Sequence, residues 1–273
     1  MDRKNLIKAI TRKKSMLCIG LDTDIKRIPA FIRQNFENPV LEFNKRIIQA
    51  CKEYAVAFKI NTAFYEAQGT DGWRNLIETI DMIPDDIFII ADAKRADIGN
   101  TSKLYARAFF EIMNVDAVTV APYMGYDSLT PFLQYQDKWI IVLALTSNAG
   151  SKDFQYLKCR DGKFLFEHIL EQASGWGNPG NMMFVAGATH PDEMTTIRRI
   201  VPEHFLLVPG VGAQGGDMEQ VLQNALTKDY GLLFNSSRGI IYASDKDDFD
   251  MAAKAKAKQL RDIMSKYIKN TTA

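Results

Sequence analysis

The chain has 273 residues, of which 47% are hydrophobic and 25% are charged. Its 34 basic and 33 acidic residues give a net charge of +1, which disfavours a surface dedicated to nucleic acid or to an acidic membrane. The sequence has no stretch of about 18 apolar residues, and its basic first segment lacks the apolar run of an export signal. We therefore expect a cytoplasmic globular protein that binds neither nucleic acid nor a membrane.

Eight short apolar segments rich in strand-forming residues recur along the chain. They span residues 16–22, 54–60, 87–93, 116–122, 139–145, 181–187, 204–210 and 230–236. Each is almost continuously apolar, which is typical of parallel strands that are covered on both faces. Amphipathic stretches such as 41–54, 101–113 and 192–201 lie between them and predict helices.

This alternation predicts an α/β fold, and eight repeats favour a (β/α)8 TIM barrel over an open doubly wound sheet. A barrel of this kind takes about 250 residues, so we expect residues 1–273 to form a single domain. Turn-forming residues from 148 to 180 predict an extended loop after the fifth strand, and the Lys-rich tail from about residue 247 predicts a terminal helix.

The strongest chemical signal is the segment Asp92-Ala-Lys94-Arg-Ala-Asp97, where the third strand ends. Barrel enzymes place catalytic groups at the carboxyl ends of their strands, and alternation puts Asp92 and Lys94 on one face. Opposite charges within ~4–6 Å favour the ionised forms, so the two aspartates would keep the lysine protonated. The motif predicts a fixed proton donor, although strand ends also carry surface ion pairs without any catalytic role.

A glycine-rich segment, PGVGAQGG at 209–216, follows the seventh strand. It contains the G-x-G-x-x-G spacing of dinucleotide sites, but that motif belongs to the first strand-helix unit of such folds. Loops after strands seven and eight of barrels are instead a common phosphate site built from backbone N–H groups. We therefore expect Gly212, Gly215 and Ser237 to form a phosphate loop, with Arg238 binding the phosphate bidentately.

The D-x-K-x-x-D motif resembles the signature of the orotidine monophosphate decarboxylases, in a bacterial subgroup with longer loops. Further matches follow in chain order, with Asp22 in GLD, Lys59 in FKIN, the PGVGAQGG segment and SSRG around Arg238. The resemblance extends from about residue 16 to residue 243. It implies decarboxylation of orotidine 5′-monophosphate to UMP and CO2 in pyrimidine biosynthesis, with no metal and no cofactor.

The same resemblance assigns roles to individual residues. Asp92, Lys94, Asp97 and Lys59 would form the charged catalytic array, with Lys94 as proton donor. Substrate would be bound by six further residues and by the phosphate loop; the six are Asp22, Thr101, Ser147, Pro209, Gln214 and Arg238. The resemblance also implies a homodimer in which Asp97 and Thr101 reach the site of the partner subunit.

Three alternatives remain open at this point. A Mg2+-dependent relative acting on a sugar phosphate would share the triplet, but we would expect an acidic residue where this chain has Lys59. A Schiff-base aldolase would need a lysine with a depressed pKa, whereas flanking aspartates raise it. A nucleotide-binding regulator without turnover would be expected to have lost part of the array, and every member is present here.

Overall fold

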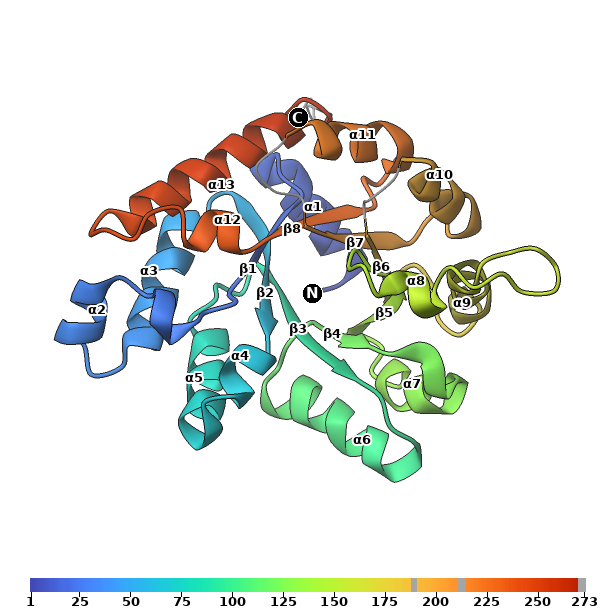
Figure 1. Ribbon diagram of the computed structural model, residues 1–273, viewed down its shortest axis with the longest axis horizontal. Helices are drawn as coiled ribbons and strands as arrows, with labels where there is room; N and C mark the ends of the chain where they lie inside the picture. Colours follow the sequence, from blue (N-terminus) through green and yellow to red (C-terminus); the bar gives the residue numbers. More distant parts are fainter. Residues whose placement is uncertain (188–190, 211–214, 270–273) are drawn as a thin grey trace. The chain divides into compact units, whose positions relative to one another are not determined.

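The computed structural model of the protein describes residues 1–187, 191–210 and 215–269 (Figure 1). Its strands form a closed parallel barrel in the order of the chain, from β1 to β8. Their bounds are β1 Leu17–Gly20, β2 Ala55–Asn61, β3 Phe88–Arg95, β4 Ala117–Val120, β5 Trp139–Leu145, β6 Met182–Ala186, β7 Phe205–Pro209 and β8 Leu232–Ser236. The predicted (β/α)8 fold is confirmed, with each strand near its predicted position.

Helices follow the strands in alternation. The longer ones are α1 Arg3–Lys13, α3 Pro39–Cys51, α5 Gly69–Asp81, α6 Gly99–Arg107, α7 Tyr126–Leu133, α9 Leu165–Ser174, α10 Pro191–Ile200, α11 Gly215–Ala225 and α13 Phe249–Ser265. The shorter turns are α2 Ala30–Asn35, α4 Ala63–Glu66, α8 Ser151–Phe154, α12 Arg238–Ile241, η1 Ile25–Arg27, the π-helical η2 Ala108–Ile112 and η3 Pro122–Met124. In the described part of the chain, no helix is both long enough and apolar enough to cross a membrane.

Helix α3 illustrates why these segments fold as they do. Apolar residues at helical spacing, including Val40, Phe43 and Ile47, are buried on one face. The helix begins with Pro39, and the side chain of Asn38 accepts a hydrogen bond from the amide of Leu41 at 3.2 Å. This cap satisfies one of the free N–H groups at the start of the helix.

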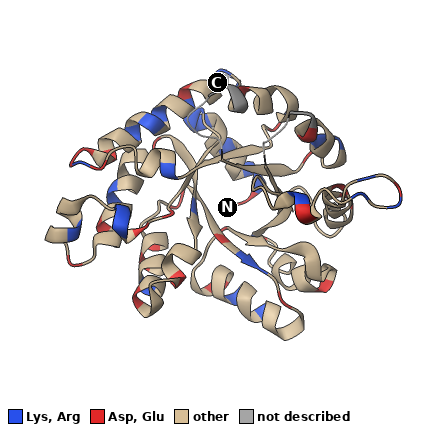
Figure 2. Ribbon diagram, viewed as in Figure 1, with Lys and Arg blue, Asp and Glu red and all other residues tan. Residues whose placement is uncertain are grey.

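The chain divides into two compact units. The second unit consists of residues 8–93 and 235–273, and it contains β1, β2 and most of β3. Helices α3, α5, α12 and α13 pack in it, α13 against both α3 and α12. Figure 2 shows Lys and Arg residues, in blue, spaced along α13, as expected for a solvated helix with a buried apolar face.

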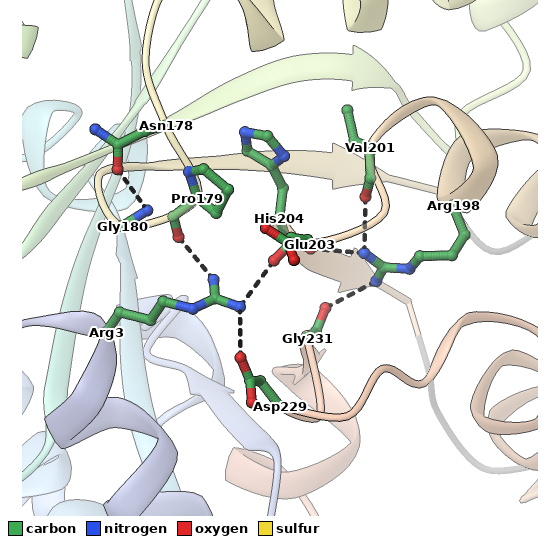
Figure 3. Close-up of polar contacts among 10 residues, drawn as sticks. All are labelled: Arg3, Asn178, Pro179, Gly180, Arg198, Val201, Glu203, His204, Asp229 and Gly231. Atoms are coloured by element: carbon green, nitrogen blue, oxygen red, sulfur yellow. Dashed lines mark hydrogen bonds and ion pairs between the residues drawn. The ribbon is translucent and has the colours of Figure 1, made fainter.

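The first unit consists of residues 1–7 and 94–234. Two arginines tie its segments together through backbone carbonyls (Figure 3). Arg3 donates to the carbonyls of Pro179 and Glu203 at 2.7 and 2.9 Å. The guanidinium of Arg198 donates to four carbonyl groups, those of Ala225, Val201, His204 and Gly231. Burial lowers the pKa of Arg198 to about 10, which still leaves it charged at neutral pH.

The segment at 148–180, for which an extended loop was expected, contains regular structure. It holds α8, an isolated β-bridge between Lys158 and Phe164, and α9. Helix α9 buries Phe166, Leu170 and Ala173, which lie three or four residues apart. That spacing is a helical signal, and the neighbouring glycines and asparagines obscured it.

Candidate active site

Three charged side chains meet at the carboxyl ends of β1, β2 and β3. Parallel pairing sets Gly20 opposite Lys59 and Asn61 opposite Asp92, so residues at these strand ends lie at neighbouring positions. The Nζ of Lys59 lies 2.9 Å from an oxygen of Asp92 and 3.5 Å from Oδ1 of Asp22. The exposed fraction of the side chain is only 6% for Lys59, 12% for Asp92 and 16% for Asp22. We call Asp22, Lys59 and Asp92 the charged cluster.

The cluster keeps Lys59 protonated. Burial alone would lower the pKa of this lysine, but the charges of Asp92 and Asp22 and the hydrogen bond to Asp92 outweigh it and raise the pKa. An amine in this state is a poor nucleophile, so the surroundings of Lys59 disfavour Schiff-base chemistry there. The arrangement instead provides a fixed positive charge with carboxylates on two sides.

The backbone around Asp22 is held by two tyrosines that no sequence motif singled out. Tyr65 is fully buried, and its hydroxyl donates to the carbonyl of Leu21 at 3.2 Å. The hydroxyl of Tyr242 donates to the carbonyl of Asp22 at 3.1 Å and accepts from the amide of Asp24 at 2.7 Å. These contacts fix the end of β1 and leave the Asp22 carboxylate for the cluster.

The side chain of Ser237 lies close to the same strand end. A Cβ on Gly20 would lie 1.8 Å from Oγ of Ser237, so only glycine permits this approach. The side chain of Asn235 donates to that Oγ at 3.4 Å, while its buried Oδ1 has no hydrogen-bond partner among the described residues. Arg238 is exposed at the start of α12. A glycine inside an apolar strand signals close backbone approach, so Gly20 could have been singled out from the sequence.

Lys94 follows on β3, in the first unit. Its backbone has φ of +48°, which is unusual for a residue with a side chain, and its side chain is exposed. Asp97 is half-buried and accepts from the amide of Ile98 at 2.8 Å. Thr101 is exposed in the first turn of α6. Asp97 and Thr101 are not members of the charged cluster.

Ser147 lies just beyond β5, beside the ends of two other strands of the first unit. A Cβ on Gly187 would lie 2.7 Å from the amide nitrogen of Ser147, so the absence of a side chain lets the chain after β6 come close. Pro209 ends β7, and Gly210 after it has φ of +81° with its Cβ position 4.0 Å from Oγ of Ser147. The exposed hydroxyl of Ser147 is thus brought near the segment that opens the glycine-rich loop.

Part of the predicted phosphate loop lies outside the described residues. Gly212 and Gln214 fall there, and Gly215 is the first residue of α11. Their predicted contacts with a phosphate stay predictions.

An apolar pocket of the first unit is not where a phosphorylated substrate would bind. It has a volume of about 860 Å³ and lies beside β5 and α9, with Tyr123, Phe154 and Trp176 in its walls. No lysine or arginine is among the described residues that line it. A dianionic group needs such donors, so the candidate site remains the charged strand ends.

Comparison with known proteins agrees with this geometry. The family model described as "Orotidine 5′-phosphate decarboxylase / HUMPS family" matches residues 15–249. The chain is 51% identical over 272 residues to a Bacteroides fragilis protein named orotidine 5′-phosphate decarboxylase, covering 98% of this chain and 99% of that one. It is 53% identical over 258 residues to a Porphyromonas gingivalis protein of the same name, covering 93% and 92% of the two chains.

A solved structure is also similar. The Leishmania donovani OMP decarboxylase superposes with a TM-score of 0.82 at 38% identity, covering 97% of this chain and 99% of that chain. Both the sequence and the fold therefore place the chain in the orotidine 5′-phosphate decarboxylase / HUMPS family.

Proposed function

We propose that this chain decarboxylates orotidine 5′-monophosphate to UMP and CO2 in pyrimidine biosynthesis, without a metal or an organic cofactor. The observation that carries the proposal is the buried Lys59 between Asp22 and Asp92, together with the position of Asp92 two residues before Lys94 on β3. The relatives that cover nearly the whole chain carry the decarboxylase name, which favours this member of the family over a sugar-phosphate enzyme.

The reaction breaks the bond between C6 and the carboxylate and leaves its electron pair on C6. Lys94, as an ammonium group, would stabilise this developing charge and then deliver its proton to C6. Asp92 would lie next to the departing carboxylate, so that repulsion in the ground state is relieved as CO2 leaves. Lys59 would hold Asp92 and Asp22 in place, and Asp22 would bind ribose hydroxyls.

Electrostatics at C6 alone is insufficient. A charge pair ~4 Å apart contributes about 4 kcal/mol at an effective dielectric constant of 20, and positioned proton transfer contributes ~10²–10⁴-fold. Enzymes typically lower barriers by about 8–23 kcal/mol. We therefore assign a large share to binding of the remote phosphate by Arg238, Ser237 and the glycine loop of Gly212 and Gly215.

The remaining substrate contacts complete the proposal. Gln214 would bridge the phosphate and the pyrimidine, Ser147 would hydrogen-bond the base amide, and Pro209 would line the site beside it. Asp97 and Thr101 would be contributed across a homodimer interface. The enzyme would act in the cytoplasm as a single barrel domain spanning residues 1–273.

The test follows the absorbance of orotidine monophosphate at neutral pH in EDTA. We expect wild-type protein to turn over, Lys94→Ala to lose nearly all activity, and Lys138→Ala, a surface lysine bonded to Asn114, to keep it. Absence of turnover in EDTA, with Mg2+ restoring activity toward a sugar phosphate, would reject the proposal in favour of the metal-dependent branch of the family.

A further inference from the structure

The backbone of Lys94 adopts a conformation that needs support. Its φ of +48° is in the left-handed region, which is strained for a residue with a Cβ. Such strain persists only where the surrounding structure fixes it, and it occurs often at functional sites. In β3 this conformation turns the chain at the very residue that carries the amine.

A threonine on the next strand supports this turn. The amide of Lys94 donates a hydrogen bond to Oγ1 of Thr119 at 2.9 Å. Thr119 lies in β4 between Val118 and Val120, and only 1% of its surface is exposed. A β-branched side chain packed at such a position has a stiff χ1 angle, so its hydroxyl is held in one place.

The residue after Lys94 is fixed as well. The carbonyl of Arg95 accepts from the amide of Ala121 at 3.0 Å. The Cζ of Arg95 lies 5.4 and 5.5 Å from the ring centroids of Tyr105 and Phe109, one helical turn apart. These distances are within the range of cation–π contacts. The turn at Lys94 is therefore anchored on both sides, with the Thr119 hydroxyl as its side-chain anchor on the amide.

We propose that Thr119 is a positioning residue for the proton donor: its hydroxyl holds Lys94 in the left-handed turn that aims the ammonium group at C6. This inference rests on the proposed function, in which Lys94 supplies the proton. Without the hydroxyl, the Lys94 amide loses this acceptor and the strained turn can relax toward an ordinary strand conformation. Substrate binding through the phosphate would persist, because neither Thr119 nor Lys94 is assigned to it.

The test compares Thr119→Val with Thr119→Ser. Valine has nearly the same shape and removes only the hydroxyl, whereas serine retains it. A misplacement on the order of 1 Å costs about 10²-fold in rate, so we expect kcat of Thr119→Val to fall by about 10- to 100-fold with little change in KM. Thr119→Ser should recover most of the lost kcat.

Ser15→Ala provides the matched control. Ser15 is buried, and its hydroxyl accepts a hydrogen bond from the backbone amide of Leu17 at 3.1 Å. Leu17 is the first residue of β1, so this contact lies at the amino end of a strand. Its loss should lower the melting temperature but leave kcat unchanged. If Thr119→Val does not fold, Thr119→Cys takes its place, since a thiol is only a weak acceptor.

The outcomes distinguish a failure of the positioning role of Thr119 from a failure of the proton-donor role of Lys94. Wild-type kcat in folded Thr119→Val, or an equal kcat loss in Ser15→Ala, would overturn the positioning role. A fall in kcat that serine does not restore would overturn it too, because kcat would then not depend on the presence of the hydroxyl. If Lys94→Ala itself retained turnover, the assigned role of Lys94 would fail, whatever the result at Thr119.

Discussion

Two carboxylates keep Lys59 charged, and Lys59 in turn compensates the negative charges of Asp22 and Asp92. In Lys59→Met, Asp22 and Asp92 would face each other with no cation between them in a place where little solvent reaches. Removing one member of a buried ion pair costs about 3–5 kcal/mol. We expect Lys59→Met to lose about 3 kcal/mol of unfolding free energy at pH 7, together with most of its activity.

Urea unfolding of a double variant tests this cause. Lys59→Met/Asp92→Asn, which removes one of the two negative charges, should recover part of the loss of stability at pH 7. A double variant no more stable than Lys59→Met would show that lost packing, and not charge, is responsible.

The left-handed backbone of Lys94 predicts an unusual ranking of two inactive variants. Both Lys94→Ala and Lys94→Gly lack the amine, but only glycine adopts φ of +48° without strain. We expect Lys94→Gly to be more stable than Lys94→Ala by about 1 kcal/mol, the reverse of the usual order of the two residues in a strand. Thermal unfolding of both proteins checks this, and a more stable alanine variant would contradict it.

At the level of elements, β1 packs closely against the segment before α12 because Gly20 has no side chain. Gly20→Ala would place a methyl group within 1.8 Å of Oγ and 2.8 Å of Cβ of Ser237. Overpacking of this kind costs typically about 1–3 kcal/mol. We expect Gly20→Ala to be destabilised and to bind substrate with a raised KM, because Ser237 must move.

A double-mutant cycle isolates that contact. Ser237→Gly removes the two atoms that would lie within 3.0 Å of the new methyl group, so Gly20→Ala/Ser237→Gly should be more stable than the sum of the single effects predicts. We expect a coupling of about 1 kcal/mol or more from chemical unfolding. Strict additivity would mean that the two segments do not approach each other in solution as they do in the structure.

The sequence predicted some elements of this fold much better than others. The eight strands were found because parallel strands buried on both faces are almost continuously apolar, as in β2 and β6. The eighth strand begins two residues later than predicted, since Tyr230 and Gly231 have positive φ and form a turn. Apolar composition alone does not distinguish such a turn from the start of a strand.

In the candidate site, too, some residues could be predicted from the sequence and others could not. Asp22, Lys59 and Asp92 were predicted because charges that end apolar strands stand out, and the structure brings them together. Tyr242 and Thr119 were missed because an aromatic residue or a threonine among apolar neighbours is an ordinary core pattern. Their contribution depends on one hydroxyl and its partner, and this pairing exists only once the chain has folded.

For the whole molecule, we expect His204 to make the free energy of unfolding depend on pH. This histidine is 7% exposed, packs against Phe184, and has no hydrogen-bond partner for either ring nitrogen among the described residues. Burial, with Arg3 and Arg198 nearby, lowers its pKa from 6.5 to about 4. The unfolded chain therefore takes up the proton first as the pH falls, so this contribution to stability is intact above pH 6.5 and is lost progressively toward pH 4.

His204→Phe provides the comparison, because it keeps a ring against Phe184 and removes the titration. The unfolding free energy of wild type relative to this variant should be constant above pH 7 and should decline by up to about 3 kcal/mol between pH 6.5 and pH 4. Other acidic groups titrate in both proteins and cancel in the difference. A difference that does not vary with pH would place the imidazole in contact with solvent.

The contacts of Arg3 have a consequence for synthesis on the ribosome. Its partners Pro179, Glu203 and Asp229 lie 176, 200 and 226 positions later in the chain. At about 5–20 residues per second, translation reaches the last of them roughly 10–45 s after Arg3 is added. Until Pro179 is added the first helix has none of these anchors, so a nascent chain stalled before residue 179 should leave it accessible to proteases, whereas the released protein should protect it.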